Sequence, residues 1–353
     1  MSETPFIITV DTEGDNIWAR PREITTRNAA FLPRFQSLCE RYRFKPVYLT
    51  NYEMAISDAF CEFGRDVVAR DAGEIGMHLH AWNSPPLYPL TEDDFRYQPY
   101  LVEYPAAVMK EKIRTLTRLL EDRFGRRIAS HRAGRWAFDG RYAAMLLDAG
   151  YRVDCSVTPG VDWSRNPGAP GGHGSKYSAF PDRPYFFSPA NICEPSAGPL
   201  LEVPMTVRSG RRYREIPQAY RLPLVRWLVK KVFPAPTWLC PTPLQESRNL
   251  NLMLTLAQQA RVDGASHVEF MVHSSELMPG GSPAFRTESD IDRLYAHLEM
   301  LFGELSAWCR GTTLAEYDHA LRSAAAAMQP TVVTAPPQPE QDRCRHDAAY
   351  GEA

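Results

Sequence analysis

The sequence predicts an α/β fold in which a mainly parallel sheet closes into a barrel related to the TIM type. Seven short apolar runs alternate with seven longer stretches of helical period, which is the pattern of repeated strand–helix units. The chain has 353 residues, enough for one large barrel with insertions. An open, doubly wound sheet is the alternative arrangement of the same elements.

The predicted strands are short runs rich in apolar and β-branched residues. They lie at 6–10, 46–50, 75–80, 128–131, 151–156, 201–205 and 268–273. The predicted helices lie between and after them, at 27–42, 61–72, 105–124, 139–149, 244–262, 287–309 and 313–328. Asp139 is a suitable cap for the helix that follows it, and Gly150 is suited to end that helix.

One domain is expected over residues 1–328, followed by a disordered tail at 329–353 that is polar and rich in proline. Half of the 30 prolines fall between Pro159 and Pro243, so we interpret 160–245 as long ordered excursions from the barrel. Within them, the apolar and basic segment 222–233 suits either a membrane surface or a helix packed on the barrel.

The composition and charge exclude several classes of protein. Hydrophobic residues make up 44% of the chain and charged residues 23%, which is ordinary for a globular protein. The net charge of −2 gives no electrostatic footprint for nucleic acid. No apolar run is long enough to span a membrane, and the N-terminus resembles no signal peptide. Seven cysteines without a Cys-x-x-Cys pair favour reduced thiols, so we expect a cytoplasmic protein.

Two acidic residues stand where the first predicted strand ends. Asp11 and Glu13 are two positions apart, so they project to the same side if the strand continues through them. Two carboxylates held together repel each other unless a cation or a shared proton lies between them. In parallel α/β folds, the C-terminal ends of the strands are where functional sites are built.

A His-x-His pair ends the third predicted strand. His78 and His80 lie on one face of that strand, so their rings can converge on one metal ion. With a carboxylate from the first strand they would form a three-ligand site that leaves a position open for water or substrate. Zinc is the preferred ion for this set, with cobalt, nickel and manganese as alternatives.

Three further segments place polar residues at strand ends. Arg132 follows the fourth strand and is expected to pair with Asp11, while Arg135 is expected to face a substrate and Trp136 to wall its pocket. Asp154 suits either an acceptor for a histidine or a cap, and the sequence leaves both open. His273 ends the last strand, where a free imidazole can act as a general acid.

The order of these motifs resembles the polysaccharide deacetylase superfamily, the NodB-homology or carbohydrate esterase family 4 type. The motifs are Asp11-Thr12-Glu13, Gly76-Met77-His78, Arg132-Ala133-Gly134, Asp154-Cys155-Ser156 and His273, and the resemblance covers about residues 5–320. It implies a distorted (β/α)7 barrel, a divalent metal and hydrolysis of an N-acetyl group on a sugar.

The resemblance also implies roles for individual residues. Asp11 would be the general base and Glu13 the carboxylate ligand of the metal. His78 would be the first histidine ligand, Arg132 would hold the base, and His273 would be the general acid.

The sequence departs from the usual pattern of the superfamily at three points. The second histidine ligand is expected four residues after the first, where this chain has Trp82, so His80 is our substitute. The carboxylate ligand is usually Asp and is Glu13 here, and the usual Arg-x-Pro is Arg132-Ala133-Gly134. We assign Trp82 to contacts with the sugar.

The function expected from the sequence is therefore removal of an N-acetyl group from an amino sugar. That sugar would be part of a polymer, a lipid-linked intermediate or a nucleotide sugar. Hydrolysis of another linear or cyclic amide is one alternative, and a sugar-binding barrel that has lost its metal is another. A glycosidase is disfavoured, because its two carboxylates would be only two residues apart on one strand and the two histidines would be unexplained.

Overall fold

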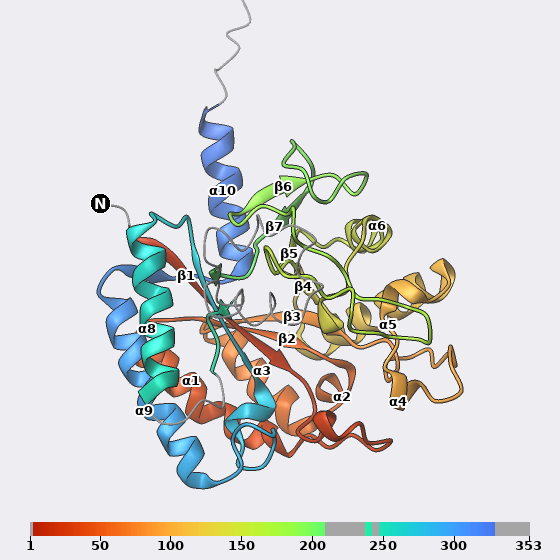
Figure 1. Cartoon of the computed structure of the whole chain (residues 1–353), viewed down its shortest axis with the longest axis horizontal. Coiled ribbons are helices and arrows are strands. Elements are labelled where there is room, and N and C mark those ends of the chain that lie inside the picture. The colour runs from red at the N-terminus through yellow and green to blue at the C-terminus, as the bar shows by residue number, and fades with distance from the viewer. Residues whose placement is uncertain (1–2, 209–236, 242–246, 329–353) are drawn as a thin grey trace, which may run out of the picture.

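A curled sheet of parallel strands forms the centre of the computed structural model, which describes residues 3–208, 237–241 and 247–328 (Figure 1). All seven predicted strands are present. They are β1 (Thr4–Thr12), β2 (Pro46–Thr50), β3 (Glu74–Leu79), β4 (Ser130–Ala133), β5 (Val153–Asp154), β7 (Leu200–Glu202) and β10 (Val268–His273).

The order of these strands identifies the type of sheet. They are hydrogen-bonded in parallel in the order β10, β1, β2, β3, β4, β5, β7. From β1 to β7 these strands follow one another in chain order, and β10, the last of the seven, pairs with β1. The direction of the strand order therefore never reverses. A doubly wound sheet requires such a reversal, so the predicted distorted α/β barrel is confirmed and the doubly wound arrangement is excluded.

The barrel is distorted between β7 and β10, where the described residues form no ladder. Instead, single hydrogen bonds connect β10 with the segments that follow β7 in the chain. The Glu269 amide donates to Oγ1 of Thr206 at 2.8 Å, and the Met271 amide donates to the carbonyl oxygen of Leu239 at 3.0 Å. The short strands β8 (Val207–Arg208) and β9 (Thr237–Trp238) pair with each other here. We call this region the seam.

Besides the short pair β8 and β9, two further strands were not predicted. Strand β6 (Tyr185–Phe187) runs antiparallel to β7, within the excursion at 160–245. Strand β11 (Cys309–Gly311) pairs with the start of β1. The predicted helix at 287–309 was therefore too long, because Cys309 belongs to a strand and the helix ends at Ser306.

Helices cover the outside of the sheet, and each predicted helix has a counterpart (Figure 1). The expected helix at 27–42 is divided: a 3-10 turn at Arg27–Phe31 precedes the α-helix, which has Pro33 in its first turn. The Asp139 carboxylate caps α6 as expected, accepting from the Tyr142 amide at 2.8 Å. The α-helices are α1 (Leu32–Arg41), α2 (Tyr52–Ala55), α3 (Asp58–Ala69), α4 (Asp94–Tyr97), α5 (Ala106–Phe124), α6 (Gly140–Asp148), α8 (Ser247–Val262), α9 (Glu288–Ser306) and α10 (Leu314–Met328).

Apolar residues fill the space between the sheet and the helices, and Phe302 of α9 is one of the central ones. Its ring makes edge-to-face contacts with Phe6 of β1, Phe44 and Phe270 of β10 at centroid distances of 5.6 to 6.0 Å. These contacts fix α9 against the two strands that carry Asp11 and His273.

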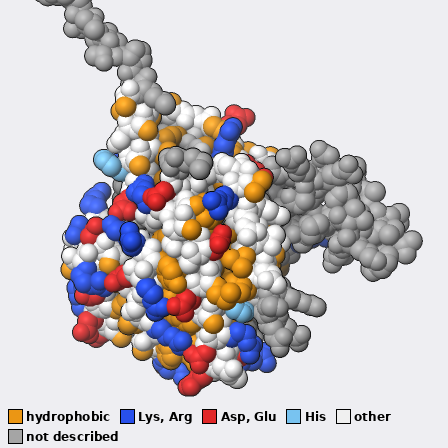
Figure 2. Space-filling view, turned by 90° about the vertical axis from the view of Figure 1, so that its left-hand side faces the viewer, with side chains coloured by type: hydrophobic (Ala, Val, Ile, Leu, Met, Phe, Trp, Pro, Cys, Tyr) orange, Lys and Arg blue, Asp and Glu red, His pale blue; other side chains and the backbone are white. Residues whose placement is uncertain are grey.

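The surface over α8 and α9 carries interspersed positive and negative side chains with small hydrophobic groups between them (Figure 2). Among the described residues, no helix is long and apolar enough to cross a membrane. The segment 222–233 and the predicted tail at 329–353 lie outside the described residues.

Replacement of Phe302 by alanine is expected to lower the free energy of unfolding by about 3–5 kcal/mol, because the ring is fully buried and its removal leaves a cavity. Urea unfolding followed by circular dichroism measures this. The control is Met300→Ala on the same helix, whose side chain is 58% exposed and should change stability by less than about 0.5 kcal/mol. Equal losses in the two variants would contradict this account of the core.

Candidate metal centre

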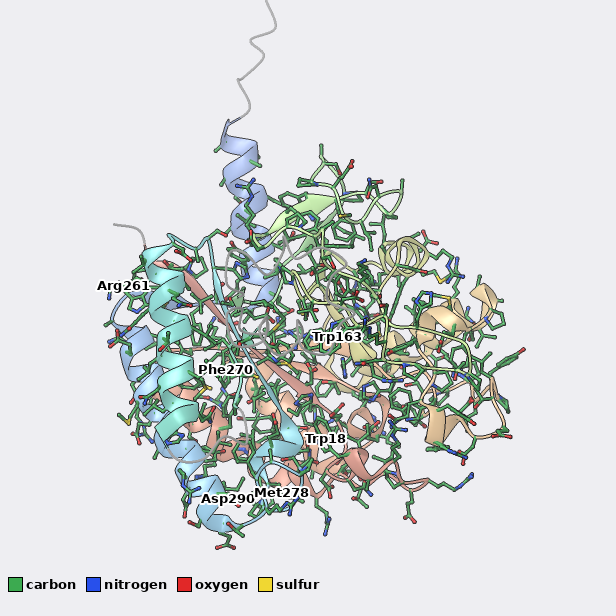
Figure 3. The ribbon with its side chains drawn as sticks, in the orientation of Figure 1. Trp18, Trp163, Arg261, Phe270, Met278 and Asp290 are labelled. Carbon is green, nitrogen blue, oxygen red and sulfur yellow. The ribbon has the colours of Figure 1, made fainter. Side chains whose placement is uncertain are left out.

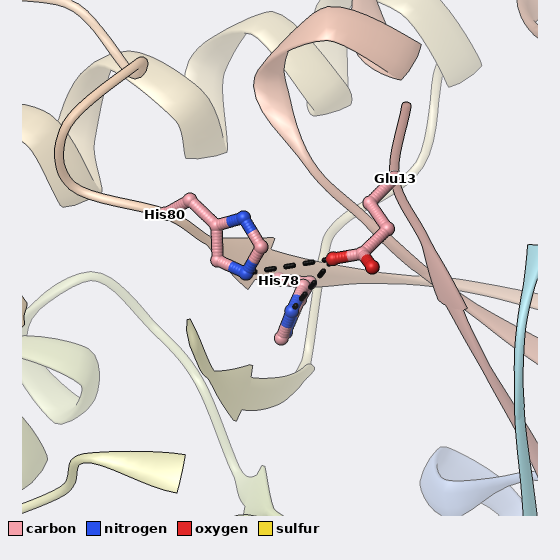
Figure 4. Close-up of side chains that lie close together, drawn as sticks. All are labelled: Glu13, His78 and His80. Atoms are coloured by element: carbon pink, nitrogen blue, oxygen red, sulfur yellow. Dashed lines mark ion pairs between the residues drawn. The ribbon is translucent and has the colours of Figure 1, made fainter. Parts of the chain in front are cut away.

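Glu13, His78 and His80 come together at the C-terminal edge of the sheet (Figure 4). Oε2 of Glu13 lies 3.8 Å from Nε2 of His78 and 3.5 Å from Nε2 of His80, and all three side chains are buried. Within the described part of the chain, this is the group of histidine, cysteine and acidic side chains that could hold a metal ion. It contains the three ligands that the sequence predicted.

The backbone around Glu13 is held by residues from three other segments. The Glu13 amide donates to Oγ of Ser274 at 3.0 Å, and its carbonyl accepts from Nδ2 of Asn28 at 2.8 Å. The amide of Gly14 donates to the buried Glu53 carboxylate at 2.8 Å. These bonds replace the ladder partners that the chain loses as β1 ends, so Glu13 has a defined direction.

Hydrogen bonding gives His78 a defined tautomer. Its Nδ1 lies 3.0 Å from the carbonyl oxygen of Arg132 and must donate to it, which leaves the Nε2 lone pair directed at Glu13. Burial lowers the pKa of His78 to about 4, and burial also lowers the pKa of His80. Both rings are therefore neutral at pH 7, the form that binds metals.

The carboxyl group of Glu13 lacks a full counter-charge. Burial, with smaller contributions from the nearby carboxylates of Asp11 and Glu53, raises its pKa to about 8 against the opposing effect of His273. A cation among these ligands would stabilise the ionised form. Ligand atoms about 2.1 Å from a tetrahedral ion lie about 3.4 Å apart, which is close to the 3.5 and 3.8 Å found here. The residues present therefore fit a divalent metal.

Asp11 lies beside the cluster and belongs to a buried ionic network. Its Oδ1 accepts from Nη1 of Arg132 at 2.6 Å, the contact that the sequence suggested, while Nη2 of Arg132 reaches Thr9 and Glu269. Burial raises the pKa of Asp11, but Arg132 and the nearby His78 and His273 lower it more, so the net shift is downward. Asp11 is consequently ionised at neutral pH.

His273 faces the same site from the end of β10. Its Nδ1 lies 3.1 Å from Oε2 of Glu276, which also accepts from the His273 amide at 2.8 Å. Burial lowers the pKa of His273, but Glu276, Glu13 and Asp11 together raise it to about 9. The imidazole is therefore protonated at pH 7. Trp18 covers it, with ring centroids 5.0 Å apart.

The candidate metal ligands, Asp11 and His273 all line one cavity of about 470 Å³. Charged, polar and aromatic side chains all contribute to its walls. Trp18 and Trp163, both labelled in Figure 3, come from the segments after β1 and β5. The aromatic residues that line it are Trp18, Trp82, Tyr100, Trp136, Trp163 and Trp238. Such rings can stack on the apolar faces of sugars.

The three residues predicted to contact a substrate also contact other groups of the protein. Arg135 lines the cavity, but its guanidinium donates to the carbonyl oxygens of Gln98 and Pro167 and lies over the ring of Tyr100. Trp136 also lines the cavity, with its ring over the guanidinium of Arg132 at 4.9 Å. Trp82 is 5% exposed and stacks on His80.

Asp154 lies below the site and contacts none of the metal-binding side chains. It accepts from His131 at 2.6 Å and from Ser156 at 2.9 Å. Both readings that the sequence left open therefore apply: Asp154 accepts from a histidine, which is outside the metal cluster, and its carboxylate also caps the turn at Ser156.

Sequence reasoning missed Glu276, Glu269, Glu53 and Trp18. Glu276 had a usable signal, because an acid three residues after a strand-ending histidine can fold back on it. The other three are brought to the site only by the tertiary fold.

Comparison with known proteins identifies the fold. No protein-family profile matches the sequence, and no curated protein matches it significantly. Among solved structures, a putative polysaccharide deacetylase from Mycobacterium smegmatis matches with a TM-score of 0.51 and 16% identity, over 96% of each chain. A putative glycoside hydrolase/deacetylase from Parabacteroides distasonis matches with a TM-score of 0.56 and 10% identity, over 91% of this chain and 72% of that one.

The chain has the polysaccharide deacetylase fold. A 4-alpha-glucanotransferase from Thermococcus litoralis is similar too, with a TM-score of 0.51 and 14% identity over 90% of this chain and 40% of that one. At these identities the matches describe the polysaccharide deacetylase fold alone, and the site must be argued from its own residues.

Metal binding at pH 7 is expected to release about one proton, because the Glu13 carboxyl has a pKa of about 8 and must ionise to become a ligand. His78, whose pKa is about 4, is already neutral and contributes none. Above pH 9 the release should largely disappear, because Glu13 is then already ionised. Calorimetric zinc titrations in buffers of different ionisation enthalpy measure this, and a release that stays constant from pH 7 to 9.5 would contradict it.

Proposed function

We propose that this protein is a metal-dependent hydrolase that removes an N-acetyl group from an amino sugar of a polysaccharide or its precursor. The observation that carries the proposal is the arrangement of three kinds of group in one cavity. These are the candidate metal ligands, an ionised carboxylate at Asp11 and a protonated imidazole at His273. The shared fold supports it.

Glu13, His78 and His80 would hold the metal ion. Zinc is the metal we propose, because imidazole and carboxylate ligands with an open position are typical of catalytic zinc sites. When bound, such an ion would polarise the acetyl carbonyl and lower the pKa of a water molecule.

Asp11 would act as the general base. Its carboxylate is ionised at neutral pH and lies 3.9 Å from the His78 ring, so it borders the cluster without being one of its three ligands. It would accept the proton of the attacking water. Arg132 fixes its direction through the 2.6 Å bond to Oδ1 and leaves Oδ2 available.

His273 would act as the general acid. Its ring carries two N–H groups when protonated, and Nδ1 is committed to Glu276. Nε2 is therefore the atom that would donate a proton to the leaving nitrogen as the C–N bond breaks, giving acetate and a free amine. The tryptophans of the cavity would stack on the sugar and exclude water from this step.

The proposed function is tested by measuring metal content and acetate release together. The parent protein loaded with zinc is expected to bind about one equivalent and to release acetate from N-acetylated oligosaccharides or sugar precursors. Glu13→Ala should lose both, because it removes a ligand. The control is Glu62→Ala, an exposed carboxylate on α3, which should keep both. A parent that binds zinc and cleaves only other amides, or none, would contradict the proposal.

Glu276→Gln should shift the basic limb of the pH profile of kcat to lower pH. The carboxylate of Glu276 is the largest of the influences that raise the pKa of His273 to about 9. Without that charge the imidazole loses its proton at lower pH, and the acid form disappears sooner. His273→Ala, as the reference, should lower kcat by roughly 10²–10⁴-fold.

The measurement is kcat against pH from 6 to 10 for the parent and both variants. The glutamine can still accept from the His273 amide, so the local turn is kept while the charge is removed. A basic limb that stays in place in Glu276→Gln would remove His273 from the role of acid.

A further inference from the structure

The second imidazole of the candidate metal site lacks the hydrogen bond that orients the first. Nδ1 of His78 is held by the carbonyl oxygen of Arg132, whereas Nδ1 of His80 is buried and has no partner among the described residues. Histidines that bind metals usually donate their other ring N–H, and this bond fixes the direction of the ring. Something else must therefore orient His80.

Trp82 contacts one face of the His80 ring. The two rings are stacked with centroids 4.3 Å apart and planes inclined by 19°. Trp82 itself is 5% exposed, so its indole is fixed by packing and not free to follow the imidazole. The two residues are two positions apart and directly follow the end of β3.

Gly134 leaves room for the edge of the same ring. A methyl group at position 134 would lie 2.5 Å from Cδ2 of His80 and 2.4 Å from the carbonyl oxygen of Leu79. Both separations are far below van der Waals contact. Any side chain at 134 would therefore push the ring away from Glu13 or separate the ends of β3 and β4.

We propose that Trp82 and Gly134 form a slot that turns His80 toward the metal, and that both are positioning residues for this ligand. The inference rests on the proposed metal-dependent function. It replaces the expectation that Trp82 serves mainly to contact the sugar. It also connects two departures of the sequence from the usual pattern, because the glycine after Arg132-Ala133 provides the space that a histidine at position 80 requires.

The slot is tested by metal affinity and by the spectrum of the cobalt-substituted protein, neither of which depends on activity. Trp82→Leu removes the stacked ring and should raise the Kd for zinc by about 10–100-fold, the usual effect of losing the support of a ligand. The absorption spectrum of cobalt-substituted Trp82→Leu should approach that of cobalt-substituted His80→Ala. Trp82→Phe keeps an aromatic face and should restore most of the affinity.

Gly134→Ala should weaken zinc binding to a similar extent, because the methyl group displaces the His80 ring. The control is Trp308→Leu. Trp308 contacts Arg261 and does not line the cavity, so its replacement should leave the Kd for zinc unchanged. Circular dichroism and urea unfolding of each variant separate a local effect from loss of the fold. If Gly134→Ala does not fold, the pair Trp82→Leu and Trp82→Phe still decides the question.

Zinc binding by Trp82→Leu as tight as that of the parent, with the same cobalt spectrum, would overturn the slot. A parent that binds zinc through His80 but releases no acetate would overturn the proposed function and leave the slot intact. A parent that binds no zinc at all would overturn both.

Discussion

The buried guanidinium of Arg132 is the interaction on which the site depends. Its side chain is completely inaccessible to solvent, and it donates to Asp11 and Thr9 of β1, to Glu269 of β10 and to the carbonyl oxygen of Cys155. A buried charge must be paired and hydrogen-bonded to be tolerated. Strands β1 and β10 are therefore held at the separation at which their side chains can pair with the guanidinium.

The same network separates the electrostatic roles of neighbouring carboxyl groups. Asp11 is next to the guanidinium and has a lowered pKa, while Glu13 is only two residues away and its pKa is raised to about 8 by burial. Glu269 shares the guanidinium, yet burial raises its pKa to about 7. Asp11 is thus ionised without a metal ion, whereas Glu13 would need a nearby cation to be ionised. This difference suits Asp11 and Glu13 to the separate roles of base and metal ligand in the proposed function.

Much of the architecture could be predicted, because strand ends in parallel sheets concentrate polar residues at one edge. The periodicity of the chain gave all seven parallel strands, and the spacing of Asp11, Glu13, His78 and His80 gave the cluster. Strand β11 was missed because three residues carry no periodic signal, and its pairing with β1 is a tertiary event. Glu269 was missed because it occurs in the middle of an apolar strand, and only the presence of Arg132 on the far side explains it.

The seam between β7 and β10 is the place where the ladder of the barrel is interrupted among the described residues. The groups proposed for chemistry stand on β10, β1, β3 and β4, which belong to one unbroken run of ladder together with β2. Across the seam, the described residues form no ladder and are joined by single hydrogen bonds, such as those from Glu269 to Thr206 and from Met271 to Leu239, and by apolar packing. Segments of new length can enter there without shifting the register of any strand that carries a reacting group. Changes of loop length at the seam would therefore reshape the wall of the cavity near Trp238 and Met271 while the candidate site on β1 and β3 keeps its geometry.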